Sequence, residues 1–459
     1  MNTNAGYIAI QLDTMGIVTG SASDERNASL TEKRGLSPIF MNHCLYPVFI
    51  RPTWAAALML LLAGCGSLVA SPLPSNTAQR GDLVSITSTS TLGLAEINAN
   101  ILTLANTYQV DTTELKGSRR YNVSLRRIVY KTVTPDGRLI DASGLMAYPL
   151  KPAGASSPLL SYQHKTLFTD AEVPSSFGPN RDAVLLLALA GSGFIVTMPD
   201  YIGYMSSTNE MHTYMHAQGL AAATVDMLRA ARHLLAQNRI ATNDQLFLTG
   251  FSEGGYATLA TQKEMEQNLP AEFRVTASMP AAGPYDMSGW TSYFSGASNG
   301  FPPMLSFVLV SYDRWYGWNR INDIYQSPYN NIVASLYDGT KSYGEIGSKL
   351  TMDSTALFSK TFRDDFLGSG KNTIKTDIAK NDLYNWKPLA PTRLFHGRND
   401  LLVPYSNSTT ALAAMKKAGS TSVTLVDCRA DAGGLGHNEC EGDYLSQVIR
   451  WFTSIALNL

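Results

Sequence analysis

The sequence predicts an α/β architecture, in which a mainly parallel sheet has helices on both faces and is interrupted by a mostly helical insertion. Short apolar runs typical of strands alternate with longer amphipathic segments, and this alternation is typical of a parallel sheet covered on both sides. The alternation stops over residues 287–388, which are rich in Trp, Tyr and Phe. A chain of 459 residues, 44% of them hydrophobic, is long enough for one large core and this insertion.

The expected elements follow from the spacing of apolar residues. Residues 94–108 and 220–235 carry Leu, Ile, Met and Ala at helical intervals, so each is expected to be an amphipathic helix. The sheet is expected to open with residues 124–134. The segments that have the apolar character of strands are residues 124–134, 142–148, 159–163, 194–198, 245–249, 392–395 and 422–426.

Residues 250–255, Gly-Phe-Ser-Glu-Gly-Gly, carry the strongest chemical signal. They follow the expected strand at 245–249 and precede residues 256–261, which are typical of a helix start. A G-x-S-x-G sequence between strand and helix is a nucleophile elbow, which holds a serine hydroxyl clear of the sheet for a base to reach. Its glycines leave room where strand and helix pass. The pattern predicts that Ser252 is a nucleophile; the alternative is a glycine-rich turn with an idle serine.

A serine nucleophile needs a histidine base, and the chain has 7 histidines. Six of them lie in a targeting segment, on or before a helix, or at the end of a strand, namely His43, His164, His212, His216, His233 and His396. His437 remains, in a glycine-rich loop after the strand expected at 422–426. We therefore expect His437 to be the base rather than a histidine of an ordinary surface loop.

The acid that orients this base is expected at Asp400, in the turn that leaves the strand at 392–395. Its carboxylate would lie at the carboxyl edge of the sheet, level with the serine. Asp431 is a weaker candidate because it shares a loop with His437, and an aspartate that merely shapes the turn is the other alternative. In this arrangement His437 takes the proton of Ser252, and Asp400 fixes the tautomer of the imidazole.

The oxyanion of the reaction needs two preplaced donors. One is expected to be the backbone N–H of Glu253, the residue after the nucleophile. Two places could supply the other donor. One is the turn at His164 and Lys165 that ends the strand at 159–163, and the other is Asp200, after the strand at 194–198.

These motifs resemble the α/β-hydrolase superfamily, and within it the bacterial lipases and esterases related to the secretory lipases, or yeast lipase A type. The resemblance rests on residues 250–255, 396–404 and 436–437, and on a Pro-Asp-Tyr-x-Gly element at 199–204. It extends from about Tyr121 to Leu459, apart from the insertion. It implies Asp200 as the second oxyanion donor. Many relatives have His-Gly-Thr where this chain has His-Lys-Thr, and Lys165 departs from that pattern.

Motifs and resemblance together imply a serine carboxylic ester hydrolase, an esterase or lipase that works through an acyl-enzyme on a small-molecule or lipid ester. A serine peptidase or amidase would use the same triad. A third alternative is an inactive surface lipoprotein that binds a ligand in the insertion. The insertion is expected to be a cap over the serine, with its aromatic side chains lining a pocket or holding the cap together. No cofactor is expected, and no metal, because Cys and His lack metal-ligand spacing.

The amino-terminal segment predicts export. Residues 54–64 form an 11-residue apolar run, too short to span a bilayer, that follows Arg51 and precedes Cys65. A cation, a short apolar run and small residues are typical of a secretory signal. Residues 62–65, Leu-Ala-Gly-Cys, resemble the lipobox of bacterial lipoproteins, so Cys65 is expected to carry a lipid that anchors the protein to a membrane.

The resulting organisation has six parts. They are a non-native extension at 1–40, a lipoprotein signal at 41–64, a tether at 65–81, core segments at 82–286 and 389–459, and the cap at 287–388. The protein is expected in the bacterial cell envelope, anchored to the outer membrane. In that oxidising compartment Cys428 and Cys440, which bracket His437, are expected to form a disulfide. A net charge of −1 gives no indication of a nucleic-acid partner.

Overall fold

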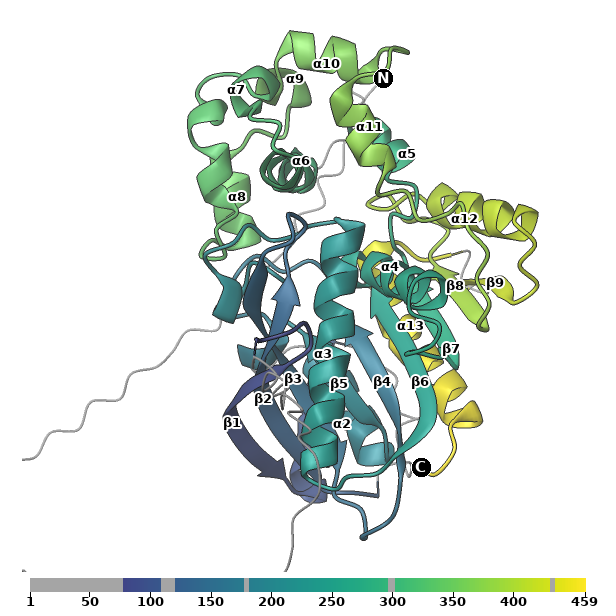
Figure 1. The fold of residues 1–459 in the computed structure, drawn as a ribbon. Coiled ribbons are helices and arrows are strands. Elements are labelled where there is room, and N and C mark those ends of the chain that lie inside the picture. Colours follow the sequence, from purple (N-terminus) through teal and green to yellow (C-terminus); the bar gives the residue numbers. More distant parts are fainter. Residues whose placement is uncertain (1–76, 109–119, 177–180, 296–301, 430–433) are drawn as a thin grey trace, which may run out of the picture. The chain divides into compact units, whose positions relative to one another are not determined.

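The computed structural model describes residues 77–108, 120–176, 181–295, 302–429 and 434–459. In these residues nine strands form one sheet, in the order β1-β2-β3-β5-β4-β6-β7-β8-β9 (Figure 1). The strands are β1 (Leu83–Leu92), β2 (Val123–Val133), β3 (Leu139–Pro149), β4 (Ser157–Gln163), β5 (Ile195–Pro199), β6 (Thr242–Phe251), β7 (Ala277–Ala281), β8 (Thr392–His396) and β9 (Val423–Asp427).

The sheet is mainly parallel, as the sequence predicts. β1, β2, β3 and β5 pair antiparallel in that order, and every pairing from β5 across to β9 is parallel. The expected opening of the sheet at residue 124 is wrong, because β1 precedes it and forms an edge of the sheet. Its sequence, Leu-Val-Ser-Ile-Thr-Ser-Thr-Ser-Thr-Leu, is mostly exposed on both faces. It therefore lacks the apolar alternation by which a half-buried strand is recognised.

Helices cover both faces of the sheet (Figure 1). α1 (Leu94–Tyr108), α2 (Arg181–Ser192) and α13 (His437–Ile455) pack on one face, and α3 (Ala217–Gln237), α4 (Glu253–Gln267) and α12 (Ser406–Lys417) pack on the other. Neighbouring residues of a strand point to opposite faces. In β4, accordingly, Leu160 joins the core under α2 and α13, whereas Leu159 joins the core under α3. This arrangement is the α/β-hydrolase fold that the motifs imply.

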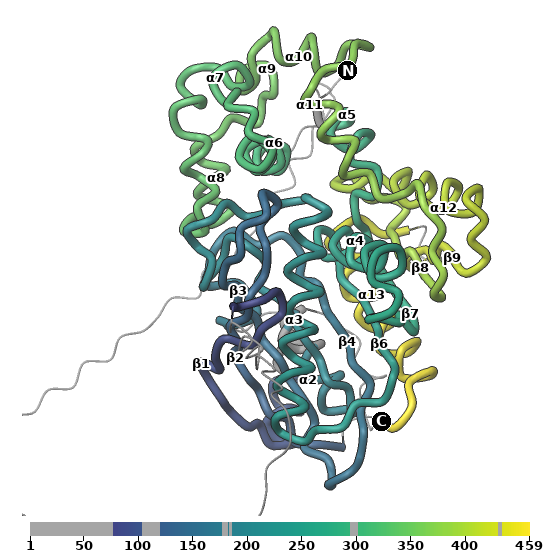
Figure 2. Tube along the Cα trace, viewed as in Figure 1, coloured from purple at the N-terminus to yellow at the C-terminus, as the bar shows by residue number. Residues whose placement is uncertain are grey.

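Between β7 and β8 the chain leaves the sheet and forms a series of helices before it returns, as the trace in Figure 2 shows. These are α5 (Met287–Ser295), α6 (Pro302–Tyr316), α7 (Ile321–Ile324), α8 (Tyr343–Lys349), α9 (Ser354–Leu357), α10 (Lys360–Leu367) and α11 (Thr373–Ala379). We call residues 287–379 the helical insertion. Polar N-caps divide it into short helices, because Ser342, Asp353, Ser359 and Asn372 each accept a backbone N–H at a helix start.

The helical insertion is joined to the sheet domain by buried polar contacts. Ser311 and Tyr312 of α6 donate to the carbonyl oxygens of His212 and Met215, at 2.7 and 2.5 Å. Trp290 of α5 donates from Nε1 to the carbonyl oxygen of Leu402 at 3.0 Å. These acceptors lie in the loops that follow β5 and β8, so the insertion contacts the edge of the sheet where the parallel strands end.

The expected extension, the signal segment and Cys65 lie outside the described residues, as do most of the tether and Asp431. None of the helices that the structure describes is both long enough and apolar enough to cross a bilayer. The same residues hold no group of three or more His, Cys, Asp or Glu side chains suited to a metal ion.

Candidate active site

Ser252 lies at the tight turn between β6 and α4, where it is the N-cap residue of the helix. Its φ is 59°, a left-handed conformation that non-glycine residues seldom adopt and that is often found at functional sites. The turn depends on its glycines. A Cβ atom on Gly250 would lie 2.4 Å from the carbonyl oxygen of Gly254, and one on Gly254 would lie 2.0 Å from that of Gln163. Only glycine allows the strand and helix to pass this closely.

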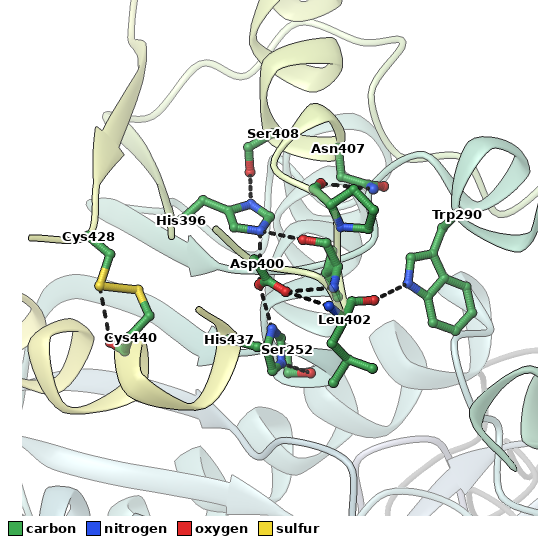
Figure 3. A network of polar contacts seen from close by, with 12 residues as sticks. Ser252, Trp290, His396, Asp400, Leu402, Asn407, Ser408, Cys428, His437 and Cys440 are labelled. Atoms are coloured by element: carbon green, nitrogen blue, oxygen red, sulfur yellow. Dashed lines mark hydrogen bonds and ion pairs between the residues drawn. A yellow bond between two sulfur atoms is a disulfide. The ribbon is translucent and has the colours of Figure 1, made fainter. Parts of the chain in front are cut away.

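The structure brings Ser252, His437 and Asp400 into one hydrogen-bonded chain (Figure 3). His437 Nδ1 lies 2.6 Å from Asp400 Oδ2, and His437 Nε2 lies 3.0 Å from Ser252 Oγ. A carboxylate only accepts, so Nδ1 donates to Asp400 and Nε2 is left to accept the serine proton. The three residues are 8%, 8% and 4% exposed, respectively, so the chain is shielded from solvent. This is the geometry of a serine activated by a histidine base.

Asp400 is held ionised by the groups around it. Its Oδ1 accepts the backbone N–H groups of Leu402 and Val403, at 2.9 and 2.7 Å. Its Oδ2 faces His437 at 2.6 Å and His396 at 3.2 Å. Burial alone would raise the pKa of Asp400, but the two histidines outweigh it and hold that pKa well below its ordinary value.

The N–H of Glu253 is well placed to serve an oxyanion. Glu253 is the first residue of α4, and the first four N–H groups of a helix have no acceptor within it. The helix dipole also favours negative charge at this end.

Asp200 does not match the oxyanion role that the resemblance implies. Its backbone N–H already donates to the carbonyl oxygen of Ser143 on β3, at 2.9 Å. Its buried carboxyl group accepts from Ser143 Oγ at 2.6 Å and from the N–H of Ser175 at 2.9 Å. Asp200 therefore links the end of β5 to β3 and to the segment after β4 that carries Ser175, and its N–H is engaged.

The turn at His164 and Lys165 is the alternative, and it lies beside the elbow. The carbonyl oxygens of Gln163 and His164 both closely approach Gly254. The Lys165 side chain forms an ion pair with Glu441 of α13, at 2.7 Å between Nζ and Oε1. Lys165 is thus occupied by Glu441, which gives a structural role to the residue that departs from the family pattern.

Comparisons with known proteins find similarity to lipases and esterases. A family model described as secretory lipase matches residues 174–271, which include Ser252. The secreted triacylglycerol lipase LIP7 of Malassezia globosa is 23% identical over 239 residues, 49% of this chain and 46% of the relative. The chain therefore spans about half the length of the curated relative that it matches.

Among solved structures, the rice cell wall degrading esterase LipA from Xanthomonas oryzae is 27% identical with a TM-score of 0.69, over 82% of this chain and 98% of that one. A Legionella pneumophila protein described as a hydrolase is 26% identical with a TM-score of 0.72, over 81% and 97% of the two chains. The chain is an α/β-hydrolase related to the secretory lipases. Candida antarctica lipase A shares its fold, at 14% identity and a TM-score of 0.55 over 77% and 78% of the two chains.

The sequence predicts His437 in a loop of this α/β-hydrolase, but the structure places it in a helix. It is the first residue of α13, directly after the N-cap Gly436. Gly433, Gly434 and Gly436 precede it, and a glycine-rich segment is typical of a loop, so the sequence does not indicate a helix start here. The disulfide between Cys428 and Cys440 is confirmed, and it ties the residue after β9 to the first turn of α13. The helix that carries His437 is therefore covalently linked to the end of the sheet.

His396 is a member of the network that sequence reasoning missed (Figure 3). It ends β8, as expected, but its buried ring contacts the acid of the site. Nδ1 lies 2.6 Å from Ser408 Oγ, and Nε2 lies 2.8 Å from the carbonyl oxygen of Val403 as well as 3.2 Å from Asp400 Oδ2. Because a carbonyl only accepts, Nε2 carries a proton that Val403 and Asp400 share. No spacing in the sequence indicates this contact, since it depends on the direction of the side chain.

Proposed function

We propose that the protein hydrolyses carboxylic esters through an acyl-enzyme formed on Ser252. The observation that supports this most strongly is the hydrogen-bonded chain from Ser252 through His437 to Asp400. A serine hydroxyl is a weak nucleophile at neutral pH, and a histidine within hydrogen-bond reach is what activates it. The secretory lipase match and the esterase neighbour support an ester rather than another acyl substrate.

In the proposed reaction Ser252 Oγ attacks the ester carbonyl carbon while its proton moves to His437 Nε2. The tetrahedral intermediate carries its negative charge on the former carbonyl oxygen, where the N–H of Glu253 and a donor of the turn at Lys165 would stabilise it. His437 then gives the proton to the departing alcohol, and an ester bond joins the acyl group to Ser252. Water, activated by His437 in the same way, releases the acid. Asp400 stabilises the imidazolium in both steps.

The helical insertion is proposed to act as a cap over this site. Its contacts with the loops after β5 and β8 support this, because His212 of the first loop contacts Glu253, and Leu402 of the second donates its N–H to Asp400. Export to the cell envelope belongs to the same proposal, and the lipid on Cys65 rests on the signal sequence alone. The secretory lipase family and the secreted lipase LIP7 agree with an exported protein.

The proposal is tested by hydrolysis of p-nitrophenyl esters from acetate to palmitate, beside a matched p-nitroanilide. Wild-type enzyme should cleave the esters, and Ser252→Ala should lose roughly 10⁴–10⁶-fold in kcat. Ser278→Ala is the matched control, since Ser278 is a buried serine of β7 outside the hydrogen-bonded chain. Cleavage of the anilide with little ester hydrolysis would favour a peptidase or amidase. Failure to cleave either substrate would leave a binding protein on a hydrolase scaffold.

A further inference from the structure

Glu253 contributes more than its backbone to the nucleophile elbow. Its fully buried side chain extends from the first residue of α4 to His212, whose Nε2 lies 2.7 Å from Glu253 Oε1. The other carboxyl oxygen, Oε2, is buried and has no hydrogen-bond partner in the part of the chain that the structure describes. The contact with His212 is therefore what fixes this carboxyl group.

The positions of the protons on His212 and Glu253 follow from the contact between His212 and Ile202. His212 Nδ1 lies 2.7 Å from the carbonyl oxygen of Ile202, which only accepts, so Nδ1 carries a proton. One further proton lies between Nε2 and Oε1, either on the imidazole or on the carboxyl group. In both cases the pair has no net charge. It therefore avoids the cost of an isolated buried charge, and removal of either partner would leave the other unpaired.

His212 is itself held in place by aromatic rings and by the helical insertion. Its ring centroid lies 4.8 Å from that of Tyr204 and 5.5 Å from that of Phe307 of α6. Ser311, one turn further along α6, donates to the carbonyl oxygen of His212 at 2.7 Å. With its ring packed and both nitrogens bonded, His212 has a single orientation. It can therefore transmit that orientation to Glu253.

We infer that His212 is a positioning residue that acts through the Glu253 carboxyl group and aims the N–H of Glu253 at the oxyanion. The inference rests on the proposed function. An oxyanion donor works only at about 2.7–3.1 Å from the developing charge, and a displacement of about 1 Å can cost ~10²-fold in rate. The N–H and the carboxyl group belong to the same residue, so a bond that fixes the side chain also limits rotation of the peptide group. Through His212, α6 of the insertion also reaches the site.

The test compares two substitutions at Glu253. Glu253→Met has similar length and no hydrogen bond, whereas Glu253→Gln can still bond to His212 Nε2. If the bond positions the N–H, E253M should lose about 10–100-fold in kcat with KM within about twofold of wild type. E253Q should retain at least about tenfold more activity than E253M. His212→Asn should resemble E253M, because asparagine can replace the bond to Ile202 but does not reach Glu253.

Binding of an alkyl boronic acid supplies a second readout. Its tetrahedral adduct on serine presents an oxygen to the oxyanion donors, so its Ki should rise in E253M and His212→Asn in parallel with the loss in kcat. His216→Asn is the matched control: His216 is a buried histidine that caps α3 through Nδ1, an interaction that asparagine preserves. H216N should leave kcat and Ki within about twofold of wild type. Thermal melts show whether each variant is folded. If E253M does not fold, kcat and Ki of His212→Asn are compared with those of E253Q instead.

Equal kcat and Ki in folded E253M, His212→Asn and wild type would overturn the inference. So would a parallel loss in H216N, since that would show a general effect of changes in this loop. A wild-type enzyme that neither hydrolyses esters nor binds the boronic acid contradicts the proposed function instead. The two failures are therefore distinguished by the wild-type measurement.

Discussion

His396 and His437 face the same oxygen of Asp400, Oδ2, at 3.2 and 2.6 Å. His437 is the proposed base, whereas His396 lies behind the acid and is bonded on its far side to Ser408. The carboxylate is thus fixed by one histidine while it orients the other. Since Oδ1 is bonded to two backbone N–H groups, the acid has a single position in the turn after β8.

Removal of the histidine behind the acid should weaken the site without abolishing it. His396→Ala leaves Asp400 with its two backbone donors and His437, but frees it to tilt. We expect a loss of about tenfold or more in kcat, because small displacements of catalytic groups are costly. Steady-state kinetics checks this. Ser408→Ala, which removes only the far hydrogen bond, should lose less than H396A; an equal or larger loss would contradict this arrangement.

Replacement of the acid itself should be far more damaging. Asp400→Asn keeps the shape of the side chain, but its NH2 group only donates, so one of the two terminal atoms can no longer accept a hydrogen bond. The amide also carries no charge to stabilise the imidazolium. A loss of roughly 10⁴-fold in kcat is expected, because Asp400 is proposed to orient His437 and to stabilise its cation. Kinetics at several pH values measures it. Activity within about tenfold of wild type would exclude Asp400 as the acid and would favour Asp431 in that role.

The ionised state of Asp400 should also appear in the pH dependence of stability. Its pKa is lower in the folded protein than the value near 3.9 expected for an unfolded chain. A lowered folded pKa gives stability that is present above the unfolded pKa and is lost as pH falls toward the folded pKa. The free energy of unfolding should therefore decrease below about pH 4. Urea titrations from pH 6 to pH 3 should show a smaller decrease in Asp400→Asn; equal slopes would contradict the assignment.

The disulfide between Cys428 and Cys440 should stabilise the part of the site that carries His437. The loop that it closes has a sequence separation of 12 residues. Loops of this size contribute about 2–3 kcal/mol to the free energy of unfolding. The double variant Cys428→Ser/Cys440→Ser should unfold at a lower temperature than the wild type. On heating, its activity should be lost at a lower temperature than that of the wild type. Reductant should lower the melting temperature of the wild type and leave that of the double variant unchanged. An equal melting temperature in all cases would show that the disulfide does not stabilise the protein.

The sequence singles out Ser252, Asp400 and His437, which the structure brings within hydrogen-bonding distance of one another, because their signals are local. The glycines around Ser252 and the turn that holds Asp400 are visible in short segments, and the strands that precede them are apolar. The rest depends on distant contacts. β1 is polar because it forms an exposed edge of the sheet. The N–H of Asp200 donates to Ser143 on β3, which precedes β5 in the sequence by two strands, and no local pattern indicates this contact. The bonds of His212 and His396 depend on side-chain direction, which spacing does not indicate.

Ser252 is proposed as the nucleophile of an acyl-transfer reaction. Mass spectrometry of the enzyme after reaction with a fluorophosphonate identifies the residue that is phosphonylated. We expect one adduct per chain, on the peptide that contains Ser252, with parallel loss of ester hydrolysis and no adduct in Ser252→Ala. An adduct on another residue, or hydrolysis that persists in Ser252→Ala, would exclude Ser252 as the nucleophile.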